Sequence, residues 1–181
     1  MSAHVVAVHR SPDHGFTKPT VSEIELIAGL GVAGDAHMGA QVKHRSRVAA
    51  DPTQPNLRQV HLIHAELFDV VAAKGFDIGP GDLGENVTTA AIDLVDLPVG
   101  AVLRVGDEAL VALTGLRNPC GQINGLREGL LEAVRDRDGD GRVVRRLAGV
   151  MGVVIRGGNV AAGAAIDVAL PPGPHRPLER V

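Results

Sequence analysis

The stretch "VGAVLRVGDEALVALTG" at residues 99–115 decides the fold class of this chain. Two runs of apolar and β-branched residues flank the pair Gly106 and Asp107. Glycine accepts the positive φ that a tight hairpin turn requires, so this pattern predicts two antiparallel strands joined by a two-residue turn. The clearest hairpin of the sequence therefore lies here.

Similar short runs, separated by glycine, proline or aspartate, recur along the rest of the chain. They are "HVVAVHR" (4–10), "TVSEIELI" (20–27), "RQVHLI" (58–63), "ENVTT" (85–89), "GVMGVVIRGG" (149–158) and "AAIDVAL" (164–170). Many short strands with frequent turn signals indicate an antiparallel sandwich or barrel. Because the chain has three phenylalanines and no tryptophan or tyrosine, its core must consist of Val, Leu, Ile and Ala.

Two segments have helical periodicity instead. "HAELFDVVAAKG" (64–75) carries an apolar face and ends at Gly75, a residue type common directly after a helix. "GLREGLLEAVRDRDG" (125–139) spaces Leu126, Leu130 and Val134 four residues apart. Both segments are predicted to be amphipathic helices that pack one face on the strands.

The composition is that of one globular domain. The chain has 181 residues, 45% hydrophobic and 22% charged, and a net charge of −3, which excludes a largely disordered protein and makes general nucleic-acid binding improbable. No apolar run is long enough for a signal peptide or a membrane helix, and one cysteine cannot form an internal disulfide. We expect a soluble, cytoplasmic protein with a single domain over 1–170. The segment 171–181, "PPGPHRPLERV", is predicted to be an extended tail outside the core.

The single cysteine lies in "TGLRNPCGQING" (114–125). A lone cysteine is most often an inert, buried residue, but Cys120 stands among turn-forming and amide residues rather than in an apolar run. Arg117 precedes it by three positions, and a nearby cation lowers the pKa of a thiol. Cys120 is therefore a candidate nucleophile or metal ligand.

The segment "GLGVAGDAHMG" (29–39) contains glycines in the G-x-G-x-x-G order. It neither opens a helix nor belongs to a βαβ unit, so a dinucleotide site is rejected. Asp35 and His37 can bring a carboxylate and an imidazole together on one short turn. The alternative, in which Asp35 binds turn amides and His37 is exposed, is about equally favoured.

Three further motifs are ambiguous or weak. The basic cluster "KHRSR" (43–47) is most simply a solvated loop, but it can also receive a phosphate. "DRDGDG" (136–141) begins like a calcium loop but has Leu147 where a bidentate Glu is needed, so a polar turn is the better interpretation. The histidines lack the spacing and the sulfur partners of a structural zinc site.

With these residues in view, the chain resembles the MOSC family, the molybdenum cofactor sulfurase C-terminal domain, in its small stand-alone bacterial form. The resemblance rests on the order of four segments. These are "GLGVAGDAHMG" (29–39), "GDLGENVTT" (81–89), "LRNPCGQI" (116–123) and "AGVMGVVIRGGNVAAG" (148–163). It implies a mainly β, closed and mostly antiparallel barrel of the pyruvate-kinase β-barrel type with a few peripheral helices.

The resemblance also implies binding of the molybdenum cofactor (molybdopterin), with Cys120 as the molybdenum ligand or the sulfur carrier. A soft thiolate suits a metal already held by a dithiolene. Since the chain has no tyrosine or tryptophan to stack on the pterin, contacts are expected from backbone, amides and arginine. The expected cofactor-binding residues are Arg117, Asn118, Asp35, His37, Asn86 and Arg45. In "GDLGENV", Asn86 and backbone amides are expected to donate to the cavity of the cysteine loop, with Glu85 orienting the turn; a simple strand-entry turn is an equal alternative.

Three functions remain open. The favoured one is an oxidoreductase that reduces N-hydroxylated bases or related N-oxygenated compounds with electrons from a redox protein. The second is a sulfur carrier or transferase with a persulfide on Cys120. The third is a module that only binds or delivers the cofactor. No nucleic acid or membrane partner is expected.

Overall fold

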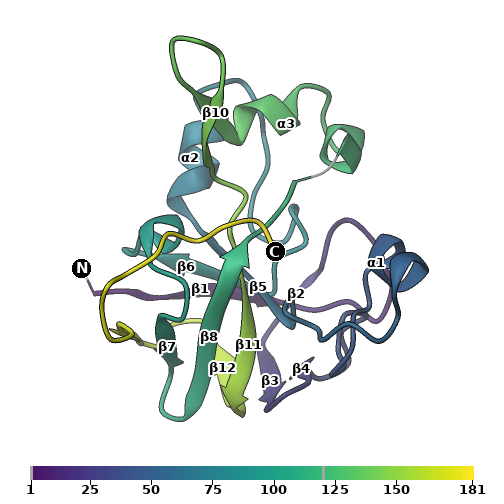
Figure 1. Ribbon diagram of the computed structural model, residues 1–181, viewed down its shortest axis with the longest axis vertical. Coiled ribbons are helices and arrows are strands. Elements are labelled where there is room, and N and C mark those ends of the chain that lie inside the picture. The colour runs from purple at the N-terminus through teal and green to yellow at the C-terminus, as the bar shows by residue number, and fades with distance from the viewer. Residues whose placement is uncertain (1, 120) are drawn as a thin grey trace.

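An eight-stranded sheet forms the centre of the protein, in the order β13-β7-β8-β11-β5-β6-β1-β2 (Figure 1). The structure, a computed structural model, describes residues 2–119 and 121–181, and for residues 45 and 46 the backbone alone. The strands of this sheet are β1 (His4–His9), β2 (Thr20–Val21), β5 (Val60–His64), β6 (Val87–Ala90), β7 (Val102–Val105), β8 (Ala109–Leu116), β11 (Val150–Arg156) and β13 (Ile166–Ala169). The prediction of a mainly β protein is confirmed.

The hairpin predicted within residues 99–115 is formed by β7 and β8. Buried and half-buried side chains alternate along β8, as expected for a strand with one face on the core. The connection differs from the prediction, because Val105 pairs with Ala109 and the turn therefore has three residues rather than two. Gly106 has a φ of +67°, the conformation for which the glycine was predicted.

The closed barrel is not supported, since the eight-stranded sheet ends in two free edges, β13 and β2. Seven neighbouring pairs connect its strands; only β5 and β6 run parallel. The segment before β13 approaches β1 through one isolated bridge, His4 to Ala165, and a few backbone hydrogen bonds. The chain turns at Gly163, with a φ of +86°, and β13 then pairs with β7, so no ladder between β13 and β1 closes the sheet.

A smaller sheet of three strands covers part of the large one. It has the order β12-β3-β4, from β12 (Gly158–Ala161), β3 (Glu23–Ile27) and β4 (Gly31–Val32). The segment predicted as one strand at 20–27 is divided between β2 and β3, with Ser22 between them. The core between the elements is built mainly from Val, Leu, Ile and Ala, as the composition requires, with Phe68 the one phenylalanine among the buried residues described for the hydrophobic cluster.

The first predicted helix is present, whereas the prediction of the second helix is mostly wrong. Helix α2 (Glu66–Ala72) buries Leu67, Phe68 and Val71, and the chain leaves it through Gly75 at a φ of +88°. Within 125–139 only Leu130–Ala133 is helical, as α3, which follows a 3-10 turn at Gly121–Gly125.

The last part of that segment forms a strand instead. β9 (Arg135–Arg137) pairs with β10 (Val143–Arg146), so its backbone groups are hydrogen-bonded across a hairpin rather than along a helix. "DRDGDG" ends β9 and forms the turn, where the Asp138 carboxylate accepts the N–H groups of Asp140 and Arg142. The polar-turn interpretation of this motif is confirmed.

The segment 171–181 is irregular, as its prolines predict, but it is not separate from the core. Leu178 is buried in the hydrophobic cluster. The Leu116 N–H donates to the Glu179 carbonyl at 2.7 Å, and an isolated parallel bridge joins Leu116 to Arg180. The division into a domain over 1–170 and a tail remains a prediction. None of the helices in the described residues is long and apolar enough to cross a membrane.

Candidate functional site

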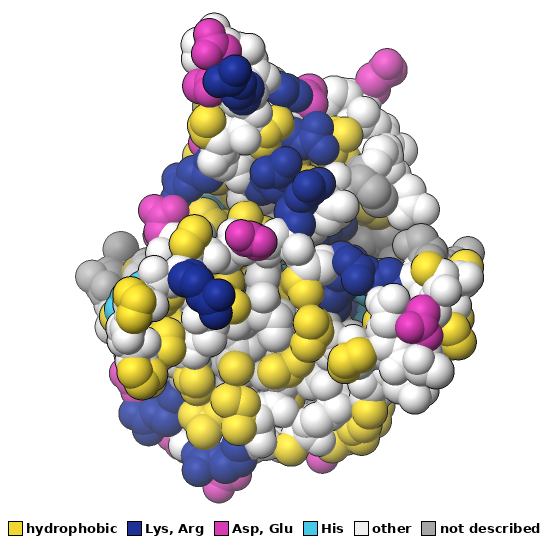
Figure 2. Space-filling view, in the orientation of Figure 1, with side chains coloured by type: hydrophobic (Ala, Val, Ile, Leu, Met, Phe, Trp, Pro, Cys, Tyr) yellow, Lys and Arg dark blue, Asp and Glu magenta, His cyan; other side chains and the backbone are white. Residues whose placement is uncertain are grey.

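A cavity of about 960 Å³ opens between the end of the large sheet and the loops around α1 (Arg45–Ala50). Figure 2 shows Lys and Arg side chains gathered on this side of the molecule, between the β9-β10 hairpin and α1. The cavity is within the size range of small-molecule and cofactor sites. It is lined by His14, Gly15, Phe16, Lys18, His37, His44, Arg47, Arg58, His61, Leu83, Gly84, Asn86, Arg117, Asn118, Gln122, Gly125, Leu126 and Met151.

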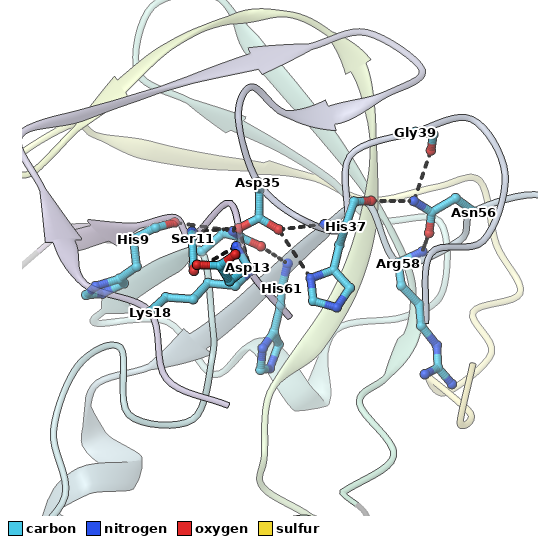
Figure 3. A network of polar contacts seen from close by, with 11 residues as sticks. His9, Ser11, Asp13, Lys18, Asp35, His37, Gly39, Asn56, Arg58 and His61 are labelled. Atoms are coloured by element: carbon cyan, nitrogen blue, oxygen red, sulfur yellow. Dashed lines mark hydrogen bonds and ion pairs between the residues drawn. The ribbon is translucent and has the colours of Figure 1, made fainter. Parts of the chain in front are cut away.

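Asp35 is the centre of a buried polar network beside this cavity (Figure 3). Its carboxylate accepts the backbone N–H groups of Ser11 and His37 and lies 2.8 Å from the ammonium nitrogen of Lys18. Burial by itself raises the pKa of Asp35, but the hydrogen bonds from His37 and the charge of Lys18 outweigh it and hold that pKa well below its usual range. Asp35 is therefore an ionised structural anchor whose acceptors are used inside the protein.

His37 is fixed by this anchor. Its Nδ1 lies 3.2 Å from the Asp35 carboxylate, which leaves Nε2 as the ring nitrogen not held by Asp35. Each of the two hypotheses for Asp35 and His37 is therefore correct in part. Asp35 binds turn amides, as one hypothesis states, and it also orients the imidazole, as the other states. The His37 ring contacts the rings of His14 and His44, at centroid distances of 5.1 and 4.6 Å.

His44 adds an uncharged imidazole to this group. Burial lowers its pKa to about 3, and the charges of His37, Arg58 and Arg117 act in the same direction. A neutral ring can accept a hydrogen bond and adds no further positive charge to the cavity wall.

Asn86 lies at the cavity, together with Arg117 and Asn118 of the cysteine loop, as the shared-cavity hypothesis requires. Its amide is nevertheless engaged by the protein. Nδ2 donates to Asp35 at 3.0 Å and to the His9 carbonyl at 3.2 Å, and Oδ1 accepts the N–H of His61. Both amide hydrogens are used, so the expectation that this side chain donates to a cofactor is not supported; it positions Asp35 instead.

Glu85 holds the "GDLGENV" turn, as predicted. Oε1 accepts the Gly81 N–H at 2.6 Å and the Thr88 hydroxyl at 3.0 Å. Burial raises the pKa of this carboxyl group. The turn therefore delivers Asn86 to the cavity while Glu85 itself stays in the protein interior.

Several cations face the same space. The Arg117 guanidinium lies over the ring of Phe16, 5.7 Å from its centroid. Arg58 and Arg47 line the wall beside it. The "KHRSR" segment is not a loop throughout, because α1 begins at Arg45; of the described side chains, His44 and Arg47 line the cavity. The side chain of Arg45 lies outside the described residues.

Cys120 also lies outside the described residues, so its thiol is not placed. Two positions before and after it, Asn118 and Gln122 line the cavity. Among the described residues, no three His, Asp or Glu side chains are grouped to hold a metal ion.

The sequence interpretation missed Phe16, Lys18, Arg58 and His61. His61 lies in the segment "RQVHLI", which predicted only a strand; β5 carries it to the cavity wall, where Nε2 lies 2.9 Å from the Ala148 carbonyl. Lys18 and Phe16 follow "SPDHG", a turn-rich segment that carried no pattern of its own.

The fold and the site define a β-sheet domain with a basic, histidine-lined cavity at the ends of its strands. The chain belongs to the MOSC domain family, whose model matches residues 36–167. No protein with a curated description matches its sequence.

Solved structures show the same fold. The YuaD protein from Bacillus subtilis has a TM-score of 0.75 and 23% identity, over 93% of this chain and 96% of that one. YiiM from Geobacillus stearothermophilus has a TM-score of 0.64 and 17% identity, over 92% and 75% of the two chains. YiiM from Escherichia coli has a TM-score of 0.63 and 20% identity, over 97% and 73%.

Proposed function

We propose that this protein binds the molybdenum cofactor in the histidine-lined cavity and reduces N-hydroxylated bases or related N-oxygenated compounds. The observation that carries the proposal is the placement of Arg117, Asn118 and Gln122, which flank Cys120, in one cavity with Lys18, Arg58 and His37. This wall offers cations for a phosphate and amides for a pterin. The Phe16 ring adds an apolar face that the composition did not lead us to expect.

The residues present fit the cofactor. A volume of about 960 Å³ accommodates a pterin with its phosphate, and the cationic wall faces it without a carboxylate among the described lining residues. When bound, the cofactor would supply two-electron chemistry and a metal held by dithiolene sulfurs. Cys120 would provide a soft thiolate ligand, and Arg117, Arg58 and Arg47 would hold the phosphate.

The protein would also handle the protons of the reaction. Reduction of R–NH–OH to R–NH₂ and water breaks the N–O bond and consumes two electrons and two protons, the electrons coming from a separate redox protein. His37 is suited to deliver a proton through Nε2, because Asp35 fixes the ring through Nδ1 at 3.2 Å. His44, uncharged through burial, lies beside it as an acceptor.

The test is metal and pterin analysis of the protein purified from a host that makes the cofactor, followed by an assay of N-hydroxylated-base reduction with a chemical reductant. The proposal is supported if the protein contains close to one molybdenum and one pterin per chain and also reduces an N-hydroxylated base. Cofactor without reduction, but with a persulfide on Cys120, favours the sulfur carrier. Bound cofactor with neither reduction activity nor a persulfide supports the third function, a module that only binds or delivers the cofactor. Absence of molybdenum and pterin contradicts all three.

A further inference from the structure

A second cavity of about 700 Å³ adjoins the first, and the two share Arg47, Arg58 and Asn118 in their walls. It lies between the β9-β10 hairpin and the C-terminal segment. Its lining is Arg47, Arg58, Val95, Asp96, Leu116, Asn118, Val144, Arg145, Arg146, Pro177, Leu178, Glu179, Arg180 and Val181. Five of these are arginines and two are acidic, so positive charge dominates the wall.

Arg145 pairs with Asp93 and Asp96, but the other arginines of this wall lie near further cations. Burial lowers the pKa of Arg146, and the neighbouring charges of Arg180 and Arg135 lower it further. Burial also lowers the pKa of Arg58 to about 10, together with the charges of Arg47 and Arg117. Like charges held together stabilise the binding of an anion between them, because the anion relieves their repulsion.

The acidic residue Asp96 of the wall is already paired with an arginine. Asp96 is bound by Arg145, with 2.9 Å between Oδ1 and the guanidinium nitrogen. Within the part of the chain that the structure describes, no carboxylate lies within ion-pair distance of Arg146 or Arg180. In addition, Arg58 Nε is buried and has no hydrogen-bond partner in the described residues. An unmatched buried donor at the junction of the two cavities is suited to an acceptor from outside the chain.

The fold fixes the backbone that carries these side chains. Arg146 ends β10, and the bridge to Leu116 fixes the backbone of Arg180. Close approach of the C-terminal segment depends on Gly115, where a Cβ would lie 2.5 Å from the Glu179 carbonyl oxygen and 2.7 Å from Val181 Cβ. Arg58 also donates to the backbone oxygen of Val181. Strand and bridge pairing therefore bring the backbone positions of these arginines to the same cavity.

We propose that this second cavity, formed by Arg146 and Arg180 with Arg58 and Arg47 at its entrance, binds a phosphate group of a ligand that extends from the first cavity. The planar guanidinium group matches phosphate oxygens with paired N–H donors. The proposal rests on the proposed function, because that function places a ligand in the first cavity. The phosphate can belong to a nucleotide joined to the pterin or to a phosphorylated N-hydroxylated substrate.

Binding is tested first with inorganic pyrophosphate, measured by isothermal titration calorimetry on the full chain at low salt. Arg146→Gln and Arg180→Gln are each expected to weaken binding by about tenfold, since each removes one charged donor and lines only the second cavity. Arg142→Gln is the matched control, because this exposed arginine lies in the β9-β10 turn, pairs with Asp140 and is not among the residues that line either cavity. Unchanged affinity in both cavity variants, or equal loss in Arg142→Gln, overturns the proposal.

The source of the phosphate is then identified. Acid hydrolysis of the purified protein releases a nucleoside monophosphate if the pterin carries a nucleotide, and Arg146→Gln lowers the amount retained. If no nucleotide is released, a phosphorylated N-hydroxylated base is expected to have a KM that rises about tenfold in Arg146→Gln, with little change for its unphosphorylated form. If neither result is obtained, the cavity has no natural phosphate ligand, and the inference is contradicted. Because pyrophosphate binding needs no molybdenum, a protein that lacks molybdenum refutes the proposed function without deciding the calorimetric test.

Discussion

The Lys18 ammonium group lies 2.8 Å from the Asp35 carboxylate, and the two side chains are only 3% and 2% exposed. Burying such a pair costs desolvation free energy, and removing one partner destabilises the protein further because it leaves the other charge buried and unpaired. Asp35 in turn holds His37 and Asn86, so the ion pair connects the interior of the fold with the cavity wall.

Lys18→Met is expected to destabilise the protein by about 3 kcal/mol, because it leaves the Asp35 charge buried with hydrogen bonds alone. Urea unfolding measures this loss. The Asp35 pKa should also rise toward its ordinary value, so the variant should unfold at a higher pH on acidification than the parent. A loss below about 0.5 kcal/mol, the size of an ordinary surface substitution, would show that the pair is not important for stability.

Because His9 is buried, we expect the stability of the protein to depend on pH between about 6.5 and 4. Its ring is buried between Thr88 and Thr20, and burial, with the charge of Lys18, lowers its pKa from 6.5 to about 4. The unfolded chain therefore binds a proton at a higher pH than the folded protein does. The free energy of unfolding is therefore highest above pH 6.5, and it falls by roughly 3 kcal/mol as the pH is lowered toward 4.

The measurement is urea unfolding at several pH values between 7.5 and 4. His9→Gln should have a shallower slope than the parent over this range, while His175→Gln, at an exposed position, should have the parent's slope. Parallel curves for His9→Gln and the parent would rule out this assignment.

Gly115→Ala is expected to destabilise the protein by about 1–3 kcal/mol, because the added Cβ meets the C-terminal segment and overpacks the site. The Glu179 oxygen at 2.5 Å is backbone and cannot rotate away. Gly139→Ala is the control, since a Cβ there meets nothing within 4 Å. Thermal unfolding of the two variants gives the comparison. Equal stability of both would show that the segment docks more loosely than the structure indicates.

If Cys120 is the molybdenum ligand, as proposed, Cys120→Ser should fold like the parent but lose molybdenum, because a hydroxyl replaces the soft thiolate. We expect molybdenum content to fall at least about tenfold, and the unfolding free energy to change by less than about 0.5 kcal/mol. Metal analysis, reduction assays and thiol titration of the native protein against pH provide the data. If Cys120 is only a packing residue, the pattern reverses, with a stability loss of about 1 kcal/mol or more and unchanged function.

His37→Gln should slow reduction by roughly 10²- to 10⁴-fold if His37 delivers a proton, and should leave molybdenum content unchanged. The pH profile of kcat should lose one ionisation, which a purely structural role for His37 would not produce. His175→Gln should leave turnover and the pH profile as they are. A variant that keeps both the rate and the profile of the parent would exclude His37 as the proton donor.

The sequence by itself determined the features that depend on neighbouring residues. The β7-β8 hairpin follows from alternating apolar residues around Gly106, and α2 from an apolar face that ends at Gly75. The turn at "DRDGDG" follows from aspartates and glycines that hydrogen-bond their own backbone. The order of the glycine, "GENV" and cysteine segments identified the MOSC family, because each is a short local pattern.

Only the tertiary structure decided features that depend on distant partners. The open edges of the sheet result from where β13 and β2 pair, and Arg135–Arg137 becomes a strand because β10 supplies hydrogen bonds that a short helix could not match. Asn86 is bound by Asp35, 51 residues away, which assigns its amide to the protein interior. Hydrogen bonds and burial between such remote residues leave no periodic trace along the chain, so local sequence patterns cannot reveal them.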